Sequence, residues 1–136
     1  MVWCQLVAVF GIVGGTFFVL LVCLFGCNSN SDPQTLHDHA YKALVQGNLI
    51  EAQNEAHREC YRFRSNPEWA CRFRTLEARA VLQQGHYSEA IEILKSAPSP
   101  SDPNLAIPML ALKGEAYAKT HNFPESERAL DRKSVV

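Results

Sequence analysis

No charged side chain precedes Cys27, although the 136-residue chain has 13 Lys and Arg and 14 Asp and Glu residues. The two signs nearly cancel and leave a net charge of −1, so the composition gives no general sign of binding to nucleic acid or another polyanion. This uneven distribution divides the chain into an apolar leader and a soluble remainder, and the length predicts one domain.

Motifs of common enzymes and metal sites are missing. The sequence has no Walker loop and no HExxH, GxSxG or EF-hand pattern, and its five cysteines form no CxxC pairs. His37 and His39 would point to different sides of a helix and could not chelate one metal together. No repeat position supplies a nucleophile with a base and an orienting group. We therefore expect no catalytic site, metal or cofactor in this chain.

The leader, residues 1–27, is almost wholly apolar. A transmembrane helix needs about 20 apolar residues, and this run is long enough. A secretory signal has a shorter apolar core, followed by small residues at its cleavage site. Three interpretations compete: a lipoprotein signal peptide, an uncleaved membrane anchor and a buried helix.

The end of the leader favours the first interpretation. Leu24-Phe25-Gly26-Cys27 resembles a bacterial lipobox, with Leu three residues before the cysteine and Gly directly before it. The resemblance implies that the Cys27 thiol receives a diacylglycerol, that the leader is removed and that the new amino group is acylated. Both the lipid and the helical anchor would attach the protein to a membrane and export the remainder of the chain. Residues 28–31 would form a polar tether.

Two amphipathic helices are predicted between Trp69 and Ser96. The apolar positions of the first, spaced by four, three and four and thus on one face, are Trp69, Phe73, Leu76 and Ala80. Those of the second, with a period near 3.6, are Tyr87, Ala90, Ile91 and Leu94. Gly85 lies between them, where a helix would end with a positive φ. The stretch therefore predicts a helical hairpin.

The hairpin pattern recurs along the chain. The sequence GHYSEA at 85–90 has a counterpart in GNLIEA at 47–52 and a weaker one in HNFPES at 121–126. Offsets of 38 (47 to 85) and 36 (85 to 121) are close to the 34-residue period of tetratricopeptide repeats. With Leu110, Gly114 and Tyr117 at first-helix positions, residues 32–130 resemble the tetratricopeptide repeat (TPR) family. This resemblance implies an all-α, right-handed solenoid of helical hairpins that serves protein–protein interaction.

Local signals divide this region into three hairpins, at about 32–66, 67–103 and 104–130. Asp32 and Asn66 each precede a proline and would cap a helix that begins there. Residues 97–103 carry three prolines and would form the loop between the second and third hairpins. Residues 131–136 match the translation of a sequencing adapter. We therefore expect a non-native tail and a third hairpin that is truncated.

The resemblance also implies where a partner would bind. In such arrays the first helices of successive repeats line a concave surface that takes an extended peptide or a partner helix. The residues that map onto this surface are Tyr41, Arg72, Thr75, Arg79, Gln83, Glu115 and Lys119. Six arginines lie between residues 58 and 79, against three acidic residues. We interpret them as a solvated basic face, with a site for an acidic peptide as the alternative and no role in binding nucleic acid.

A second hypothesis concerns a longer parent protein. Residues 66–95 also resemble the repeat region of bacterial proteins whose C-terminal half is a caspase-like CHAT peptidase. There the repeats are a recognition or regulatory arm, and a downstream His and Cys cleave the substrate. Neither catalytic residue can be matched in this sequence, so the peptidase hypothesis applies only to a longer chain. A purely structural periplasmic scaffold is the third alternative.

Cys60 and Cys71 are expected on neighbouring helices, on either side of a turn near Ser65 and Asn66. Antiparallel helices would bring the two cysteines to a similar level along the paired helix axes, and an oxidising compartment would permit a disulfide. Helix axes about 8–10 Å apart would instead leave two separate buried thiols. The sequence leaves both alternatives open.

Overall fold

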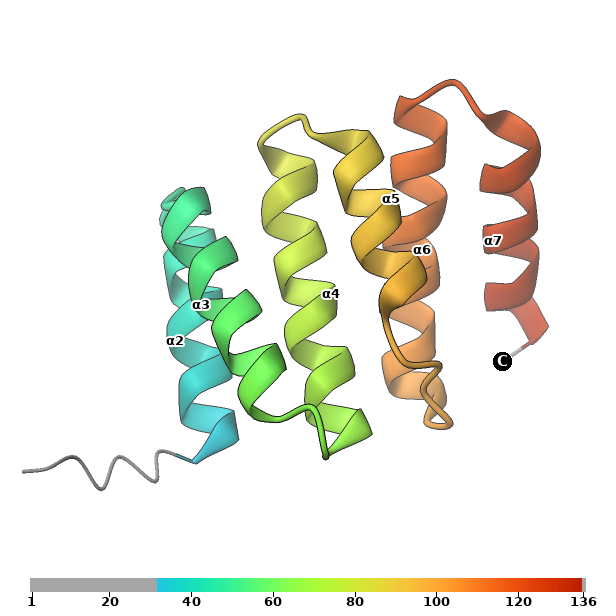
Figure 1. Cartoon of the computed structure of the whole chain (residues 1–136). Coiled ribbons are helices and arrows are strands. Elements are labelled where there is room, and N and C mark those ends of the chain that lie inside the picture. The colour runs from blue at the N-terminus through green and yellow to red at the C-terminus, as the bar shows by residue number, and fades with distance from the viewer. Residues whose placement is uncertain (1–31, 136) are drawn as a thin grey trace, which may run out of the picture. The chain divides into compact units, whose positions relative to one another are not determined.

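Residues 32–135 of the computed structural model form six α-helices and no strand, as Figure 1 shows. The helices are α2 (Pro33–Val45), α3 (Leu49–Arg62), α4 (Pro67–Gln83), α5 (Tyr87–Ser96), α6 (Pro103–Lys119) and α7 (Phe123–Val135). The predicted all-α class is confirmed for this part of the chain. The leader, Cys27 and the tether lie outside the described residues. No helix among residues 32–135 combines the length and apolar character needed to cross a membrane.

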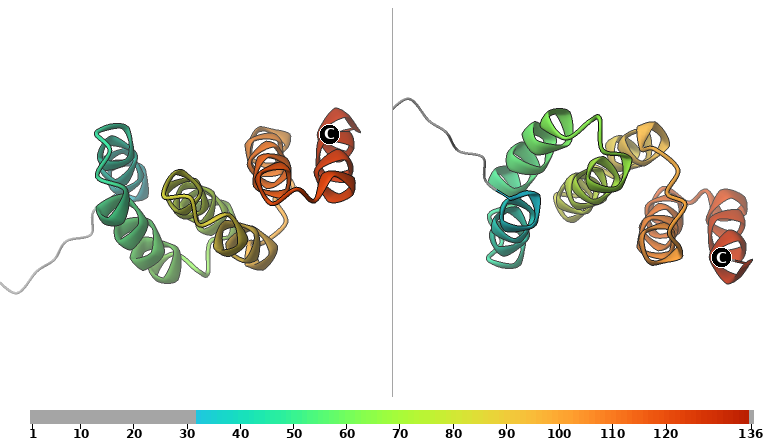
Figure 2. Two further views of the ribbon diagram at one scale, coloured as in Figure 1. Left: turned by 90° about the horizontal axis from the view of Figure 1, so that it is seen from above. Right: turned by 90° about the horizontal axis from the view of Figure 1, so that it is seen from below.

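Consecutive helices pair as hairpins that lie side by side: α2 with α3, α4 with α5, and α6 with α7 (Figure 1). Figure 2 shows α2, α4 and α6 along one side of this row, and α3 and α5 along the other. Helix α4 contacts four helices, α2, α3, α5 and α6. It is therefore the central element of the described region.

The first helix of each hairpin begins with an Asx residue followed by proline. The N-cap carboxylate or amide oxygens of Asp32, Asn66 and Asp102 accept hydrogen bonds from the main-chain N–H groups of Thr35, Trp69 and Asn104 at 3.4, 3.3 and 2.9 Å. The following proline has no N–H to leave unpaired in the first turn, and its φ already suits a helix. Two of these starts agree with the predicted ones, and α6 begins one residue before its expected start.

The turn within each hairpin contains one residue with positive φ. It is Gly47 (81°) in the first turn, Gly85 (87°) in the second and His121 (59°) in the third. The prediction for Gly85 is confirmed. Glycine adopts this left-handed conformation without a steric penalty, whereas a Cβ carries one, so the third turn holds a less favourable residue in the same conformation.

The three turns supply a matched pair of substitutions. A Cβ added at Gly85 would meet no atom within 4 Å, so Gly85→Ala has only a conformational cost. We expect it to lower the free energy of unfolding by about 1–2 kcal/mol. We expect His121→Gly to be neutral or to raise it by up to about 1 kcal/mol, because relief of the positive φ offsets the greater freedom of unfolded glycine. Urea unfolding measures both; a loss at position 121 as large as that at 85 would contradict this account.

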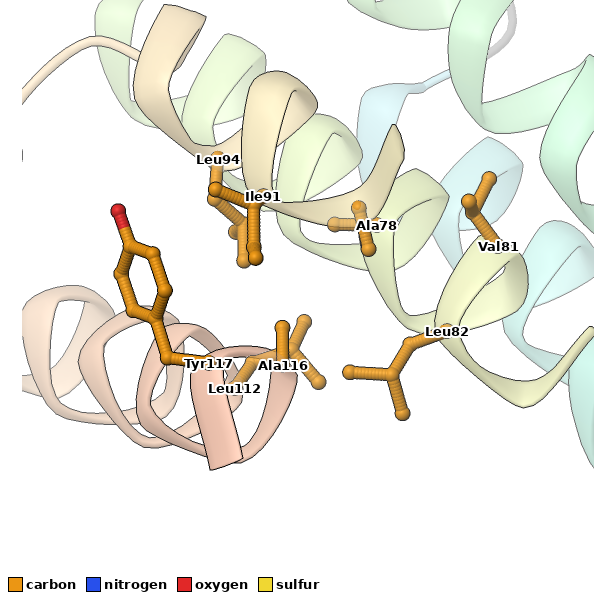
Figure 3. Packing of buried hydrophobic residues seen from close by; sticks show 9 residues of the cluster. Ala78, Val81, Leu82, Ile91, Leu94, Leu112, Ala116 and Tyr117 are labelled. Carbon is orange, nitrogen blue, oxygen red and sulfur yellow. The ribbon is translucent and has the colours of Figure 1, made fainter. Parts of the chain in front are cut away.

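The apolar core lies on both sides of α4. On one side, Leu76 and Ala80 of α4 pack with small residues of α2 and α3, including Ala40 and Ala56. On the other side, the cluster in Figure 3 joins α4, α5 and α6 through Ala78, Val81, Leu82, Ala90, Ile91, Leu94, Leu112, Ala116 and Tyr117. The apolar faces predicted for residues 69–96 therefore form the core, with Trp69 and Tyr87 at its margin.

Two buried glutamates hold α3 and its junction with α4. Glu77 of α4 is 3% exposed and lies 2.8 Å from Nδ1 of His57 and 3.0 Å from Nη1 of Arg74. Because His57 belongs to α3, this carboxylate joins the two helices. Glu59 is also 3% exposed and accepts hydrogen bonds from Arg58 and Arg62. Burial of a carboxylate is tolerated only when such partners replace its hydration.

Helix α7 packs closely on α6 through a glycine. A Cβ at Gly114 would stand 3.0 Å from the side chain of Leu130, and Ser126 Oγ donates a 2.9 Å hydrogen bond to the Gly114 carbonyl. The helix continues through residues 131–135, past Leu130, where the repeat region was expected to end. Helix α7 therefore has 13 residues, between three and four turns.

Candidate functional site

A pocket opens on the side of the row made by α2, α4 and α6, and its cavity volume is about 200 Å³. Its lining comes from all three helices: His37 and Tyr41 of α2, Cys71, Arg72, Thr75, Leu76 and Arg79 of α4, and Asn104, Leu105 and Pro108 of α6. We refer to it as the α2–α4–α6 pocket. Helices far apart in sequence meet here because α4 contacts both α2 and α6.

Four of the seven residues mapped as partner-binding line this pocket together: Tyr41, Arg72, Thr75 and Arg79. The other three, Gln83, Glu115 and Lys119, are exposed and lie outside the lining, toward the C-terminal ends of α4 and α6. Gln83 is one turn beyond Arg79 on the same stripe of α4, so it extends the face without entering the pocket.

Arg72 is held in place by two neighbours on its own helix. Its Nη2 donates a 3.0 Å hydrogen bond to Glu68, and its Cζ lies 5.2 Å from the centre of the Trp69 ring. Such a cation–π contact stabilises an arginine over the face of an indole. The Nε atom of Arg72 is buried and has no hydrogen-bond partner among the described residues. Glu68 and Trp69 therefore fix the guanidinium of Arg72 at the pocket, while its Nε is covered by the protein.

Arg79 differs from the other arginines near it. It is half-buried at the pocket and makes no hydrogen bond or ion pair with any described residue. No Asp or Glu lines the pocket, whereas two guanidinium groups do. Leu76, Leu105 and Pro108 supply apolar wall beside these charges. The arrangement can receive an anionic group on a short apolar stem.

His37 at the pocket is held toward its neutral form. Burial is the main cause that lowers the pKa of His37 below its ordinary value; nearby Arg72 also lowers it, while Asp38 opposes the shift. The ring packs edge-on against Phe73, with centroids 5.7 Å apart, and is tilted against Trp69 at 6.2 Å. The side chain therefore acts mainly as part of an aromatic cluster at the start of α2.

The depressed pKa of His37 predicts a stability loss in acid. Because the folded state binds this proton less readily than the unfolded state, stability is complete above the ordinary histidine pKa of about 6.5 and falls as the pH drops through it. We expect His37→Leu to flatten the fall in urea midpoint between pH 7.5 and pH 5.5. Equal falls in the variant and the wild type would contradict this assignment.

Comparison with protein-family models, curated proteins and solved structures gave no match for this chain. Within residues 32–135 no group of three or more His, Cys, Asp or Glu side chains could hold a metal ion. The three helices of the pocket instead offer arginine, tyrosine, threonine and an apolar wall, which suit noncovalent binding of a partner group.

Cys60 and Cys71 are free, buried thiols in the structure. Cys60 Sγ lies 3.6 Å from the Ala70 carbonyl oxygen, and Cys71 Sγ lies 4.0 Å from Met109 Sδ. Burial is the main cause that raises the pKa of each thiol. The structure thus has the arrangement of two separate buried thiols; a disulfide between them stays a prediction for the oxidised protein.

Six residues of the pocket were not predicted from the sequence: His37, Cys71, Leu76, Asn104, Leu105 and Pro108. The mapping of repeat positions placed the α6 contribution at Glu115 and Lys119, near the end of that helix. The pocket instead uses its first turns. Pro108 was a usable signal, since it supplies no N–H to the carbonyl of Asn104 and so marks an altered turn of helix beside the site.

Proposed function

We propose that this chain is a membrane-attached, exported protein–protein interaction module, a right-handed TPR-type solenoid whose α2–α4–α6 face binds a peptide or a partner helix. One observation carries the proposal: four mapped partner-binding residues from two predicted repeats converge on a single pocket, and the third repeat completes its lining. Pockets between helices of neighbouring repeats are a common place for such recognition.

The arrangement of charges supports a binding role over a purely structural one. The side chain of Arg79 is half-buried at the pocket, but none of its guanidinium nitrogens is among the buried atoms without a hydrogen-bond partner. The charge therefore stays in contact with water. It makes no ion pair with any described residue, so an acidic group of a bound partner could pair with it.

Peptide selection tests the binding role. A random peptide library would be displayed against the full chain in nanodiscs, and enriched peptides would be measured on two variants. Thr75→Trp fills the pocket, whereas Ser88→Trp adds the same ring at an exposed position of α5, away from the lining. We expect at least a tenfold loss of affinity in the first variant only, with both folded by circular dichroism. No enriched peptide, or equal binding to both variants, would contradict the proposal.

Membrane attachment is tested separately through the mature N-terminus. If the lipobox resemblance holds, mass spectrometry of protein from a diderm host should find a lipid-modified Cys27 at the first position. Each buried methylene contributes about 0.8 kcal/mol, so several acyl chains anchor a protein stably. Detection of an unmodified Met1 with an intact leader would contradict the lipid anchor and favour a helical membrane anchor.

A further inference from the structure

Six arginines lie on α3, on α4 and in the turn between them, and one of the six has no partner among the described residues. Their partners are Glu59 for Arg58 and Arg62, the Tyr61 ring for Arg64, Glu68 for Arg72 and Glu77 for Arg74. Arg79 alone among these six has no acidic or aromatic partner in the described part of the chain. Helix α4 therefore gives Arg72 and Arg74 an ion pair each and leaves Arg79 without one at the pocket.

The pocket has the size of a subsite. Sites for whole small-molecule ligands usually enclose about 300–1,000 Å³, whereas this cavity measures about 200 Å³. A space of this size suits one side chain of a longer segment that continues along the face. The remainder of that segment would continue along the face made by α2, α4 and α6.

The chemistry of the lining points to a carboxylate. Guanidinium groups form paired, charge-assisted hydrogen bonds with carboxylates, and these are stronger than bonds between neutral groups. Arg79 is unpaired within the described residues, Arg72 lines the same pocket with its guanidinium held by Glu68, and the lining contains no acidic residue. The apolar wall of Leu76, Leu105 and Pro108 suits the methylene groups of a glutamate stem.

From these observations we propose that the α2–α4–α6 pocket is the subsite for one glutamate side chain of the bound segment. Arg79 forms the ion pair with its carboxylate, and Arg72, fixed by Glu68 and Trp69, adds a second donor. This inference rests on the proposed function, since it names the chemical class of one residue in the partner.

The test uses capped single amino acids, so that its outcome does not depend on finding a partner. N-acetyl-glutamate amide, N-acetyl-glutamine amide and N-acetyl-phosphoserine amide would be titrated into the full chain in detergent micelles. Binding is read from NMR shifts of the arginine Nε–H groups and the Thr75 amide. We expect saturable, millimolar binding of the glutamate probe and no saturation by the isosteric glutamine probe.

Three variants locate the effect. Arg79→Gln should weaken binding of the glutamate probe at least fivefold. Arg79→Lys, which keeps the charge and loses the planar fork, should retain part of the affinity. Arg64→Gln, at an exposed arginine outside the pocket, should bind as the wild type does. Unfolding midpoints confirm that each variant is folded, and a variant at position 79 that fails to fold leaves the glutamate and glutamine probes to decide the question on the wild type.

Several outcomes would overturn the inference. Equal binding of the glutamate and glutamine probes would show that the pocket does not recognise the carboxylate. Unchanged binding of the glutamate probe to Arg79→Gln would show that Arg79 does not form the ion pair. Binding of the phosphoserine probe more than tenfold tighter than that of the glutamate probe would assign the pocket to a phosphorylated residue. If library peptides bind through the pocket without any acidic residue, the proposed function stands and the glutamate subsite fails.

Discussion

Phe73→Ala is expected to lower the free energy of unfolding by about 3–5 kcal/mol, the usual range for a buried aromatic truncated to alanine. Phe73 is fully buried and stands at the centre of an aromatic cluster. Its ring stacks on Phe63 at 5.8 Å and contacts Trp69 at 6.0 Å and His37 at 5.7 Å. Because the cluster joins α2, the end of α3 and α4, its loss loosens three helices at once.

Urea unfolding of the full chain, followed by circular dichroism, measures this effect. Tyr61→Ala is the matched control, since Tyr61 is an aromatic residue of α3 that is 69% exposed. Its removal should change stability by less than about 0.5 kcal/mol. A loss below about 1 kcal/mol in Phe73→Ala would show that the aromatic cluster is not a packed core.

Glu77→Ala is expected to have the second largest effect, a loss of about 2–3 kcal/mol. The substitution removes the two charge-assisted contacts that the almost fully buried Glu77 carboxylate makes, one with His57 and one with Arg74. It also leaves Arg74, whose side chain is only 24% exposed, without its carboxylate. Hydrogen bonds to charged groups contribute about 1.5–3 kcal/mol each. Because His57 is exposed, its contact adds little to the one made by Arg74, and the expected loss is close to that of a single such bond.

The control for this substitution is an exposed ion pair. Glu92 lies 2.8 Å from Lys95 on α5, with both side chains open to solvent. Glu92→Ala should cost less than about 0.5 kcal/mol, because exposed pairs are screened by water. Equal losses for Glu77→Ala and Glu92→Ala would mean that the buried carboxylate does not hold α3 to α4.

The helix starts and the turns could be predicted because their causes are local. An Asx residue before proline specifies a helix start within four residues, and Gly85 supplies a positive φ by itself. The periodic apolar positions of α4 and α5 likewise needed only the spacing along one helix. These features do not depend on which helices pack together.

The buried glutamates and the pocket depend on packing between helices, and the sequence did not reveal them. Glu77 follows the apolar position Leu76 on α4, and its burial is possible only because His57 of α3 and Arg74 reach it. The pocket needs the first turns of α6 beside the middle of α4. Mapping by repeat position gives the face of a helix but not the level along it, so the mapped residues of α4 include three that line the pocket, whereas Glu115 and Lys119 of α6 lie outside it.

The central position of α4 has a consequence for how the chain folds. Within residues 32–135, every contact between helices joins neighbours or next-but-one neighbours along the chain. Proteins with such short-range contact maps close only small loops during folding, and they usually fold in microseconds to milliseconds. Since α4 is the one helix that packs with both the preceding and the following hairpin, we expect it to form early, and the hairpins before and after it can add in either order.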